Sequence, residues 1–169
     1  MNLDNELKLA KLAAKNAGIF LTKEKVSLSK TIYSQQKDIK LDADIQTEAL
    51  IKDLLSKDSD YPILGEESGP SVKDLGITYW VIDPLDGTAN YARNIPICCV
   101  SIALIHAGDP VLGVIYDFNH DDMYSGSINH KAKLNNNEIN VSDISDKSKG
   151  TLVTGLPAQT DFSDSAIQK

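Results

Sequence analysis

Apolar residues near the start of the chain follow the spacing of an amphipathic helix. Over residues 3–21, Leu and Ala recur at intervals of three and four, which predicts a helix that ends near Gly18. The following stretch, residues 22–40, is polar and has little periodicity. We expect a loop there, with one short strand near Val26.

A second helix is predicted over residues 42–57, where Ile and Leu again share one face. Asp42 or Asp44 would cap its start. Further along, the pattern changes to short runs of β-branched and aromatic residues separated by turn residues. The strands expected from these runs cover residues 63–65, 79–82, 99–105, 111–116, 123–124 and 151–154.

Helices followed by strands predict an α+β fold, in which two N-terminal helices pack on one side of a mostly antiparallel sheet. We assign residues 1–157 to this domain. Residues 158–169 offer only about two helical turns, too few for a helix that is stable alone. We expect them to begin a helix that leads into a C-terminal domain absent from this chain, and a frayed tail is the alternative.

The composition is that of an ordinary globular protein, with 169 residues, 41% of them hydrophobic and 24% charged. The formal net charge is −7, from 17 basic and 24 acidic residues. This balance argues against nucleic-acid and membrane partners, because both attract basic surfaces. It is compatible with an anionic metabolite if divalent cations lie between the protein and its substrate.

The sequence also bears on location. No apolar run approaches the roughly 18–20 residues that a spanning helix needs, and the first residues are acidic and polar, unlike a signal peptide. Cys98 and Cys99 are adjacent, so on a strand they point to opposite faces and a disulfide between them is not expected. We interpret both as small buried residues in a reducing compartment, the cytoplasm.

Two short segments carry the chemical signal. The first is Gly65-Glu66-Glu67-Ser68-Gly69, directly after an expected strand. The second covers residues 80–91: it begins as an apolar strand that ends at Asp83, continues through a turn at Pro84, and reaches Asp86 three residues after Asp83. Acidic residues at strand ends can share one edge of a sheet, so the two segments predict a common site.

These segments supply the ligands that Mg²⁺ prefers, which are oxygen atoms at ~2.0–2.1 Å in octahedral geometry. Asp83 can bridge two ions, and Asp86 can complete the shell of one of them. The Leu85 carbonyl can act as a neutral ligand, and Glu66 adds a carboxylate from the neighbouring strand end. The spacing therefore indicates a site for hard cations.

An anion site is expected on the same turn. Gly87 and Thr88 would open a short helix, and the first N–H groups of a helix, here those of Gly87, Thr88 and Ala89, have no partner within it. Metal ligands beside such a phosphate cradle are what metal-assisted phosphate hydrolysis needs.

Each signal also has a simpler interpretation. Asp-Pro-Leu-Asp-Gly alone is most often a surface turn, and Asp44 alone is more simply a first-turn acid or a cap. Asp44 and Glu48 lie four residues apart, where like charges slightly destabilise a helix, which hints at a nearby cation. His120-Asp121-Asp122 falls in an expected hairpin turn, so we interpret it as solvated. The functional interpretation depends on the co-occurrence of the two segments.

Together the two segments resemble the inositol monophosphatase family of Mg²⁺-dependent, lithium-sensitive phosphomonoesterases. Gly65-Glu66-Glu67-Ser68, followed by Trp80-Val81-Ile82-Asp83-Pro84-Leu85-Asp86-Gly87-Thr88, is close to the family's first signature. The resemblance covers nearly the whole chain, as the N-terminal α+β half of the family's sugar-phosphatase fold. It implies hydrolysis of a phosphate monoester of a small metabolite by a metal-activated water, and a homodimer.

Carried over position by position, the resemblance implies a role for each site residue. Glu66, Asp83 and the Leu85 carbonyl would hold the first metal, and Asp83 and Asp86 the second. Thr88 would contact a metal-bound water, with Asp44 hydrogen-bonded to Thr88, so these two are the implied catalytic residues. The N–H groups of Gly87, Thr88 and Ala89 would bind the substrate phosphate.

One departure from the family is large. Its second signature, a Trp-Asp-containing helix start that supplies a third Asp to the second metal, would come after residue 169. Inositol monophosphate is the favoured substrate, and 3'(2'),5'-bisphosphate nucleotides and fructose 1,6-bisphosphate are the alternatives. A hypothesis of another class is a truncated, non-catalytic half-protein that acts by binding or assembly.

Overall fold

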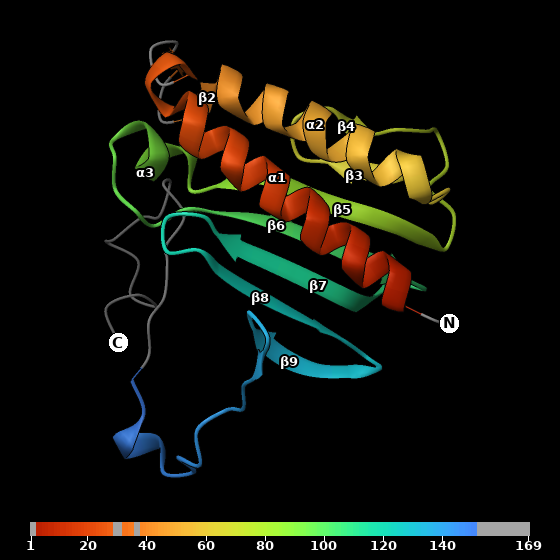
Figure 1. Ribbon diagram of the computed structural model, residues 1–169, viewed down its shortest axis with the longest axis vertical. Coiled ribbons are helices and arrows are strands. Elements are labelled where there is room, and N and C mark those ends of the chain that lie inside the picture. The colour runs from red at the N-terminus through yellow and green to blue at the C-terminus, as the bar shows by residue number, and fades with distance from the viewer. Residues whose placement is uncertain (1–2, 29–31, 36–37, 152–169) are drawn as a thin grey trace, which may run out of the picture.

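The computed structural model describes residues 3–28, 32–35 and 38–151 (Figure 1). The helices are α1 (Asp4–Leu28), α2 (Asp42–Asp58) and α3 (Thr88–Ala92), with a 3₁₀ turn at Lys147–Lys149. The strands are β1 (Ile32–Gln35), β2 (Asp38–Leu41), β3 (Ile63–Gly65), β4 (Gly69–Pro70), β5 (Thr78–Asp86), β6 (Cys99–His106), β7 (Asp109–Asp117), β8 (Asp122–Ser127), β9 (His130–Leu134) and β10 (Asn137–Glu138).

Eight of these strands form one sheet in the order β10-β9-β8-β7-β6-β5-β3-β4. Neighbouring strands pair antiparallel, except β3 and β5, which are parallel. Helices α1 and α2 lie side by side across one face of the sheet (Figure 1). The predicted α+β fold, with two helices on a mostly antiparallel sheet, is confirmed.

The first helix is longer than the apolar pattern predicts. It continues to Leu28, and Gly18 lies inside it. A Cβ atom at Gly18 would come within 2.4 Å of Tyr116 Cε1, so the glycine lets α1 pass close over β7 and does not end the helix. The predicted strand near Val26 is wrong, because no Pro or Gly interrupts residues 19–28 and the helix continues through them.

The region expected to be a loop before the second helix contains a hairpin. Strands β1 and β2 pair antiparallel, with Ile32 opposite Leu41, and form a small sheet of their own. Helix α2 then begins at Asp42, as predicted. The loop prediction was therefore wrong over most of its length.

Most of the predicted strands are confirmed. Five of the six lie within β3, β5, β6, β7 and β8. The sixth was placed at residues 151–154: Thr151 is not in a strand, and residues 152–154 lie outside the described residues. The helix start expected over residues 158–169 also lies outside them, so the predicted domain boundary stays a prediction.

The core lies between the two long helices and the sheet. Side chains on β6 alternate between buried and half-buried, as expected for a strand with one face against helices. Each large apolar side chain buried here contributes ~1.5–3 kcal/mol by leaving water. The largest fully buried residues include Leu21, Ile51, Leu55, Trp80, Ile82, Tyr91, Ile102 and Leu104.

Tyr91 attaches α3 to this core. Its hydroxyl donates a hydrogen bond of 2.8 Å to the Leu21 carbonyl of α1. Its ring meets the ring of Phe118 edge-on, with centroids 6.2 Å apart. The short helix beside the candidate site is therefore held by a buried contact to α1, not by its own length.

Cys98 is buried, Cys99 is half-buried, and both are free, so no disulfide joins them, as predicted. No helix within the described residues is long and apolar enough to cross a membrane.

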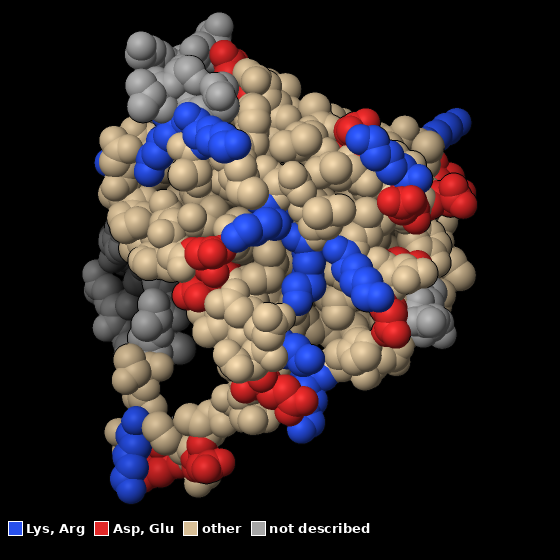
Figure 2. Space-filling view, in the orientation of Figure 1, with Lys and Arg blue, Asp and Glu red and all other residues tan. Residues whose placement is uncertain are grey.

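Charge is distributed unevenly over the surface. Lys8, Lys11, Lys131 and Lys133 line a groove between α1 and β9, and Figure 2 shows basic side chains gathered in the middle of this face. The net charge of −7 is thus compatible with a locally basic surface. The acidic residues of the candidate site lie elsewhere, beside α3.

Replacing Tyr91 with Phe tests the attachment of α3. Loss of the buried hydroxyl should lower the free energy of unfolding by about 1 kcal/mol, because the Leu21 carbonyl loses a donor that water does not replace. Urea denaturation measures the change. Tyr124→Phe is the matched control, since Tyr124 lies exposed on β8 and should give no change. Equal midpoints for the two variants would contradict the assignment.

Candidate metal and phosphate site

The parallel pair of strands brings the two predicted acidic segments together. In the register of β3 and β5, Gly65 lies opposite Ile82, so Glu66 and Asp83 follow at equivalent positions. The Glu66 N–H extends this pairing by donating to the Ile82 carbonyl at 3.2 Å. The predicted proximity of Glu66 and Asp83 is therefore a direct result of strand register.

The Asp83 carboxyl lies in a strongly acidic environment. Burial and the neighbouring Glu66, which also hydrogen-bonds to it, raise the pKa of Asp83 to about 7, with a smaller contribution from Asp86. The Leu85 N–H, 3.1 Å from Asp83 Oδ1, acts in the opposite direction. Glu66 and Asp86 thus both oppose a negative charge on Asp83, and a cation would relieve that repulsion.

Asp86 lies beside Glu66 and Asp83, but its side chain points toward Cys99. It is exposed, and its Oδ2 accepts from the Cys99 Sγ at 3.8 Å. Burial, together with Asp86 and Asp83, raises the pKa of the Cys99 thiol to about 12, so the thiol stays protonated. Strand β5 continues through Pro84, with an irregular register between Asp83 and Asp86, where the sequence predicted a turn.

The carboxylates do not form a closed metal cage. Over the part of the chain that the structure describes, no three or more His, Cys, Asp or Glu side chains are grouped to hold a metal ion. What is present is a Glu66–Asp83 pair with Asp86 next to it. This set still fits Mg²⁺, because Mg²⁺ keeps several of its waters and is commonly bound by only one or two carboxylates.

Asp44 joins this site from α2. It lies in the first turn of the helix, as the simpler interpretation has it, but it is 1% exposed and accepts a 2.8 Å hydrogen bond from the Thr88 hydroxyl. The same hydroxyl is 3.1 Å from the Leu85 carbonyl. The contact between Asp44 and Thr88 that the family resemblance implies is present, and the Leu85 carbonyl faces the same hydroxyl.

Gly87, the residue directly before α3, has a backbone conformation that favours glycine. Its φ is 92°, and a Cβ there would come within 2.7 Å of the Ile97 carbonyl oxygen. Helix α3 has only five residues, so its macrodipole is small. An anion at this turn would be held by the individual N–H groups of Gly87, Thr88 and Ala89.

A groove opens beside these residues. It has a volume of about 490 Å³ and is lined by Asp86, Gly87, Asn90, Cys99, Asp117 and His120, among others. Asp86 and Gly87 are at once site residues and groove residues.

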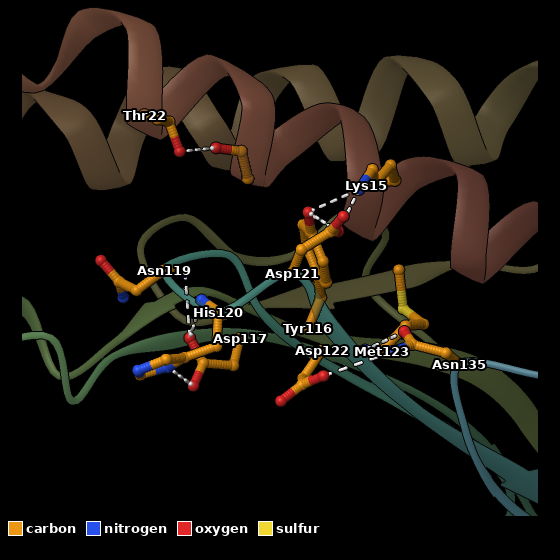
Figure 3. A network of polar contacts seen from close by, with 11 residues as sticks. Lys15, Thr22, Tyr116, Asp117, Asn119, His120, Asp121, Asp122, Met123 and Asn135 are labelled. Atoms are coloured by element: carbon orange, nitrogen blue, oxygen red, sulfur yellow. Dashed lines mark hydrogen bonds and ion pairs between the residues drawn. The ribbon is translucent and has the colours of Figure 1, made fainter. Parts of the chain in front are cut away.

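The turn between β7 and β8 forms one wall of this groove and is tied to α1 (Figure 3). Lys15 of α1 bonds to the Tyr116 hydroxyl at 2.8 Å and pairs with Asp121. His120 pairs with Asp117 at 2.7 Å, which raises the pKa of His120. His120 and Asp121 are exposed in this turn, as the solvated interpretation of His120-Asp121-Asp122 expects.

Glu48 is a site residue whose role the sequence did not reveal. It is buried in α2 and accepts hydrogen bonds from the N–H groups of Glu67 and Ser68, at 2.8 and 3.2 Å, and from the Ser68 hydroxyl. Lys52 forms an ion pair with it at 3.0 Å. Burial alone would raise the pKa of Glu48, but these bonds outweigh burial and lower it.

The cation beside Glu48 is a lysine. The four-residue spacing of Asp44 and Glu48 hinted at a bound cation, but the charge of Glu48 is balanced by Lys52 and by N–H groups. The spacing did indicate a buried acid whose charge is balanced. The sequence alone did not show which loop supplies the hydrogen bonds to it.

Comparison with known proteins places the chain in a family. A sequence profile described as the inositol monophosphatase family matches residues 2–169. The chain belongs to the inositol monophosphatase family. Relatives in this family are phosphatases, and the family is generally metal-dependent.

Individual relatives agree with the family assignment. The chain is 38% identical to a Nus factor SuhB of Xylella fastidiosa over 147 residues, which cover 85% of this chain and 53% of that protein. It is 33% identical to a fructose-1,6-bisphosphatase/inositol-1-monophosphatase of Aquifex aeolicus over 163 residues, covering 94% and 61%. A solved inositol monophosphatase from Anabaena matches with a TM-score of 0.72 and 37% identity, covering 86% and 52%. The chain spans about half the length of these relatives.

The contact between Asp44 and Thr88 can be tested by a double-mutant cycle. For Asp44→Ala and Thr88→Val we expect a coupling energy of about 1 kcal/mol or more, because a buried carboxylate accepts this bond. Urea denaturation of the four proteins gives the value. A parallel cycle of Asp44→Ala with Thr78→Val, whose hydroxyl bonds to His106 at the start of β5, should be additive. Additivity in both cycles would contradict the interaction.

Proposed function

We propose that this member of the inositol monophosphatase family carries the metal and phosphate site of a Mg²⁺-dependent phosphomonoesterase. The observation that supports it best is the Glu66–Asp83 pair, with Asp83 at a pKa of about 7, beside the hydrogen-bonded Thr88 and Asp44. Surplus negative charge next to a turn of backbone N–H groups suits cations that bridge a protein and a phosphate.

Each residue has a stated part in the proposal. Glu66, Asp83 and the Leu85 carbonyl would hold one Mg²⁺, and Asp83 and Asp86 a second. When bound, Mg²⁺ would supply the charge that activates the attacking water and stabilises the leaving oxygen. The chain's own residues would orient the attacking water and the phosphate. These residues are Asp44, Gly87, Thr88 and Ala89.

Orientation follows from the contacts observed at Thr88. Its hydroxyl donates to Asp44, so its oxygen lone pairs are left to accept a hydrogen bond from a water in the site. The buried Asp44 fixes the direction of that hydroxyl. The N–H groups of Gly87, Thr88 and Ala89 would hold the phosphate in line with this water.

Inositol monophosphate is the proposed substrate. The relatives support this class, since one is named an inositol monophosphatase and another carries that name with fructose-1,6-bisphosphatase. Fructose 1,6-bisphosphate and a 3'(2'),5'-bisphosphate nucleotide are the alternatives, and an assay of all three side by side would rank them. Lithium sensitivity, the homodimer and the cytoplasmic location stay predictions.

A second candidate function, of another class, is a non-catalytic half-protein that acts by binding or assembly. It is favoured by apolar side chains at the rim of the groove: Ile97 is 71% exposed, and Ile115 and Tyr124 are also exposed. One relative is named a Nus factor. Metal binding without turnover of any of the three substrates would support this alternative.

The proposed reaction is tested with Asp86→Asn. Loss of this carboxylate should abolish Mg²⁺-dependent phosphate release from inositol monophosphate, while leaving the free energy of unfolding nearly unchanged because Asp86 is exposed. A colorimetric phosphate assay over a range of Mg²⁺ concentrations measures the effect. Asp109→Asn, at an exposed acid that begins β7, is the matched control and should keep full activity. Equal turnover by both variants would refute the role of Asp86.

A further inference from the structure

We propose that Glu48 is a positioning residue: it fixes the turn after β3 so that the Glu66 carboxylate stays beside Asp83. The inference deepens the proposed function, and it rests on that function only in treating Glu66 as a metal ligand. The contacts that fix the turn are seen independently of any metal.

The Glu48 carboxylate binds the turn through three donors. Its two oxygens accept from the Glu67 N–H, the Ser68 N–H and the Ser68 hydroxyl. The side chain is 4% exposed, so water does not compete for these bonds. A buried carboxylate with three donors from two consecutive residues holds the main chain directly after Glu66 in one conformation.

The last residue of β3 shows how close this approach is. A Cβ atom at Gly65 would lie 2.5 Å from the carboxyl carbon and from Oε2 of Glu48. Only glycine leaves room for the carboxylate to lie against this backbone. Glu48 therefore contacts the main chain on both sides of Glu66, at Gly65 and at residues 67–68.

The opposite side of the turn is held by β5. Gly65 pairs with Ile82, and the Glu66 N–H bonds to the Ile82 carbonyl. The backbone of Glu66 thus lies between the sheet, which aligns it with Asp83, and Glu48, which prevents the turn from moving away. Without Glu48 the turn would be free to move, and the repulsion between the Glu66 and Asp83 carboxylates would push them apart.

Glu48 and Glu66 differ in how their negative charge is balanced. Glu48 is balanced by Lys52 and by backbone N–H groups, whereas Glu66 is placed against another carboxylate. Glu48 therefore stabilises the position of a ligand and is not itself offered to the ion. In metal sites, residues that do not touch the metal often hold its ligands in place through hydrogen bonds. Loss of such a residue typically weakens metal binding about 10–100-fold.

Glu48→Gln tests the inference, with Asp53→Asn as the matched control, because Asp53 is an exposed acid on the same helix. In the variant, hydrogen exchange of the Glu67 and Ser68 amides should accelerate at least about tenfold, while amides of the β5–β6 ladder stay unchanged. Calorimetric titration with Mg²⁺ alone should show affinity lower by about 10–100-fold. The control should match the unmodified chain in both measurements.

Ser68→Ala provides a variant that does not endanger folding, since Ser68 is exposed. It removes one of the three donors and should accelerate exchange at the Glu67 and Ser68 amides by a smaller factor than Glu48→Gln. Unchanged exchange at these amides in both variants would overturn the inference. So would faster exchange spread evenly over the whole sheet, because Glu48 would then act only on global stability.

The two proposals can fail separately. If the unmodified chain takes up no Mg²⁺, the proposed function fails, and the exchange measurements decide the inference alone. If the unmodified chain binds Mg²⁺ and Glu48→Gln binds it equally well, the inference fails while the proposed function stands.

Discussion

The whole site depends on one piece of strand pairing, the parallel register of β3 with β5. It is the one parallel pair among the neighbouring strands of the described sheet, and it brings the carboxyl ends of two adjacent strands to the same edge. Glu66 and Asp83 follow these ends and come within hydrogen-bonding distance. A shift of the register by one residue would turn one of the two carboxylates to the other face. The pairing of the backbone strands therefore determines that these two negatively charged side chains lie close together.

This concentration of charge needs support from the surrounding structure. Like charges held together are unfavourable, and the fold keeps them together by fixing the main chain on each side. Glu48 and Asp44 of α2 hold the turn after β3 and Thr88, and the Leu21 carbonyl of α1 holds α3 through Tyr91. Each of these contacts is a hydrogen bond made by a buried side chain, which makes it specific as well as stabilising. The helices thus do more than cover the sheet, since each sends a contact to the site.

Much of the fold could be predicted from the sequence, because hydrophobic periodicity and turn residues are local signals. The start of α2 and five strands followed from that pattern, and so did the proximity of Glu66 to Asp83. The end of α1 did not, because Gly18 is required by the close passage of α1 over Tyr116, a contact between distant residues. The β1–β2 hairpin was missed because each of its strands has only four residues, too few for a clear periodic pattern.

The site shows the same division between local and distant information. Residue types at strand ends indicated cation chemistry, but the direction of Asp86 toward Cys99 and the role of Glu48 depend on neighbours far along the chain. A like-charge pair on a helix looks the same in the sequence whether a metal or a loop satisfies it. Only the packing of α2 against the turn after β3 distinguishes the two cases.

The most direct measurement is a calorimetric titration of the chain and of Asp83→Asn with Mg²⁺. Because Glu66 and Asp86 both act on the Asp83 carboxylate and raise its pKa, we predict saturable Mg²⁺ binding by the unmodified chain and its loss in the variant. Identical Mg²⁺ affinity in the two proteins would contradict the central claim that this edge of the sheet is a cation site.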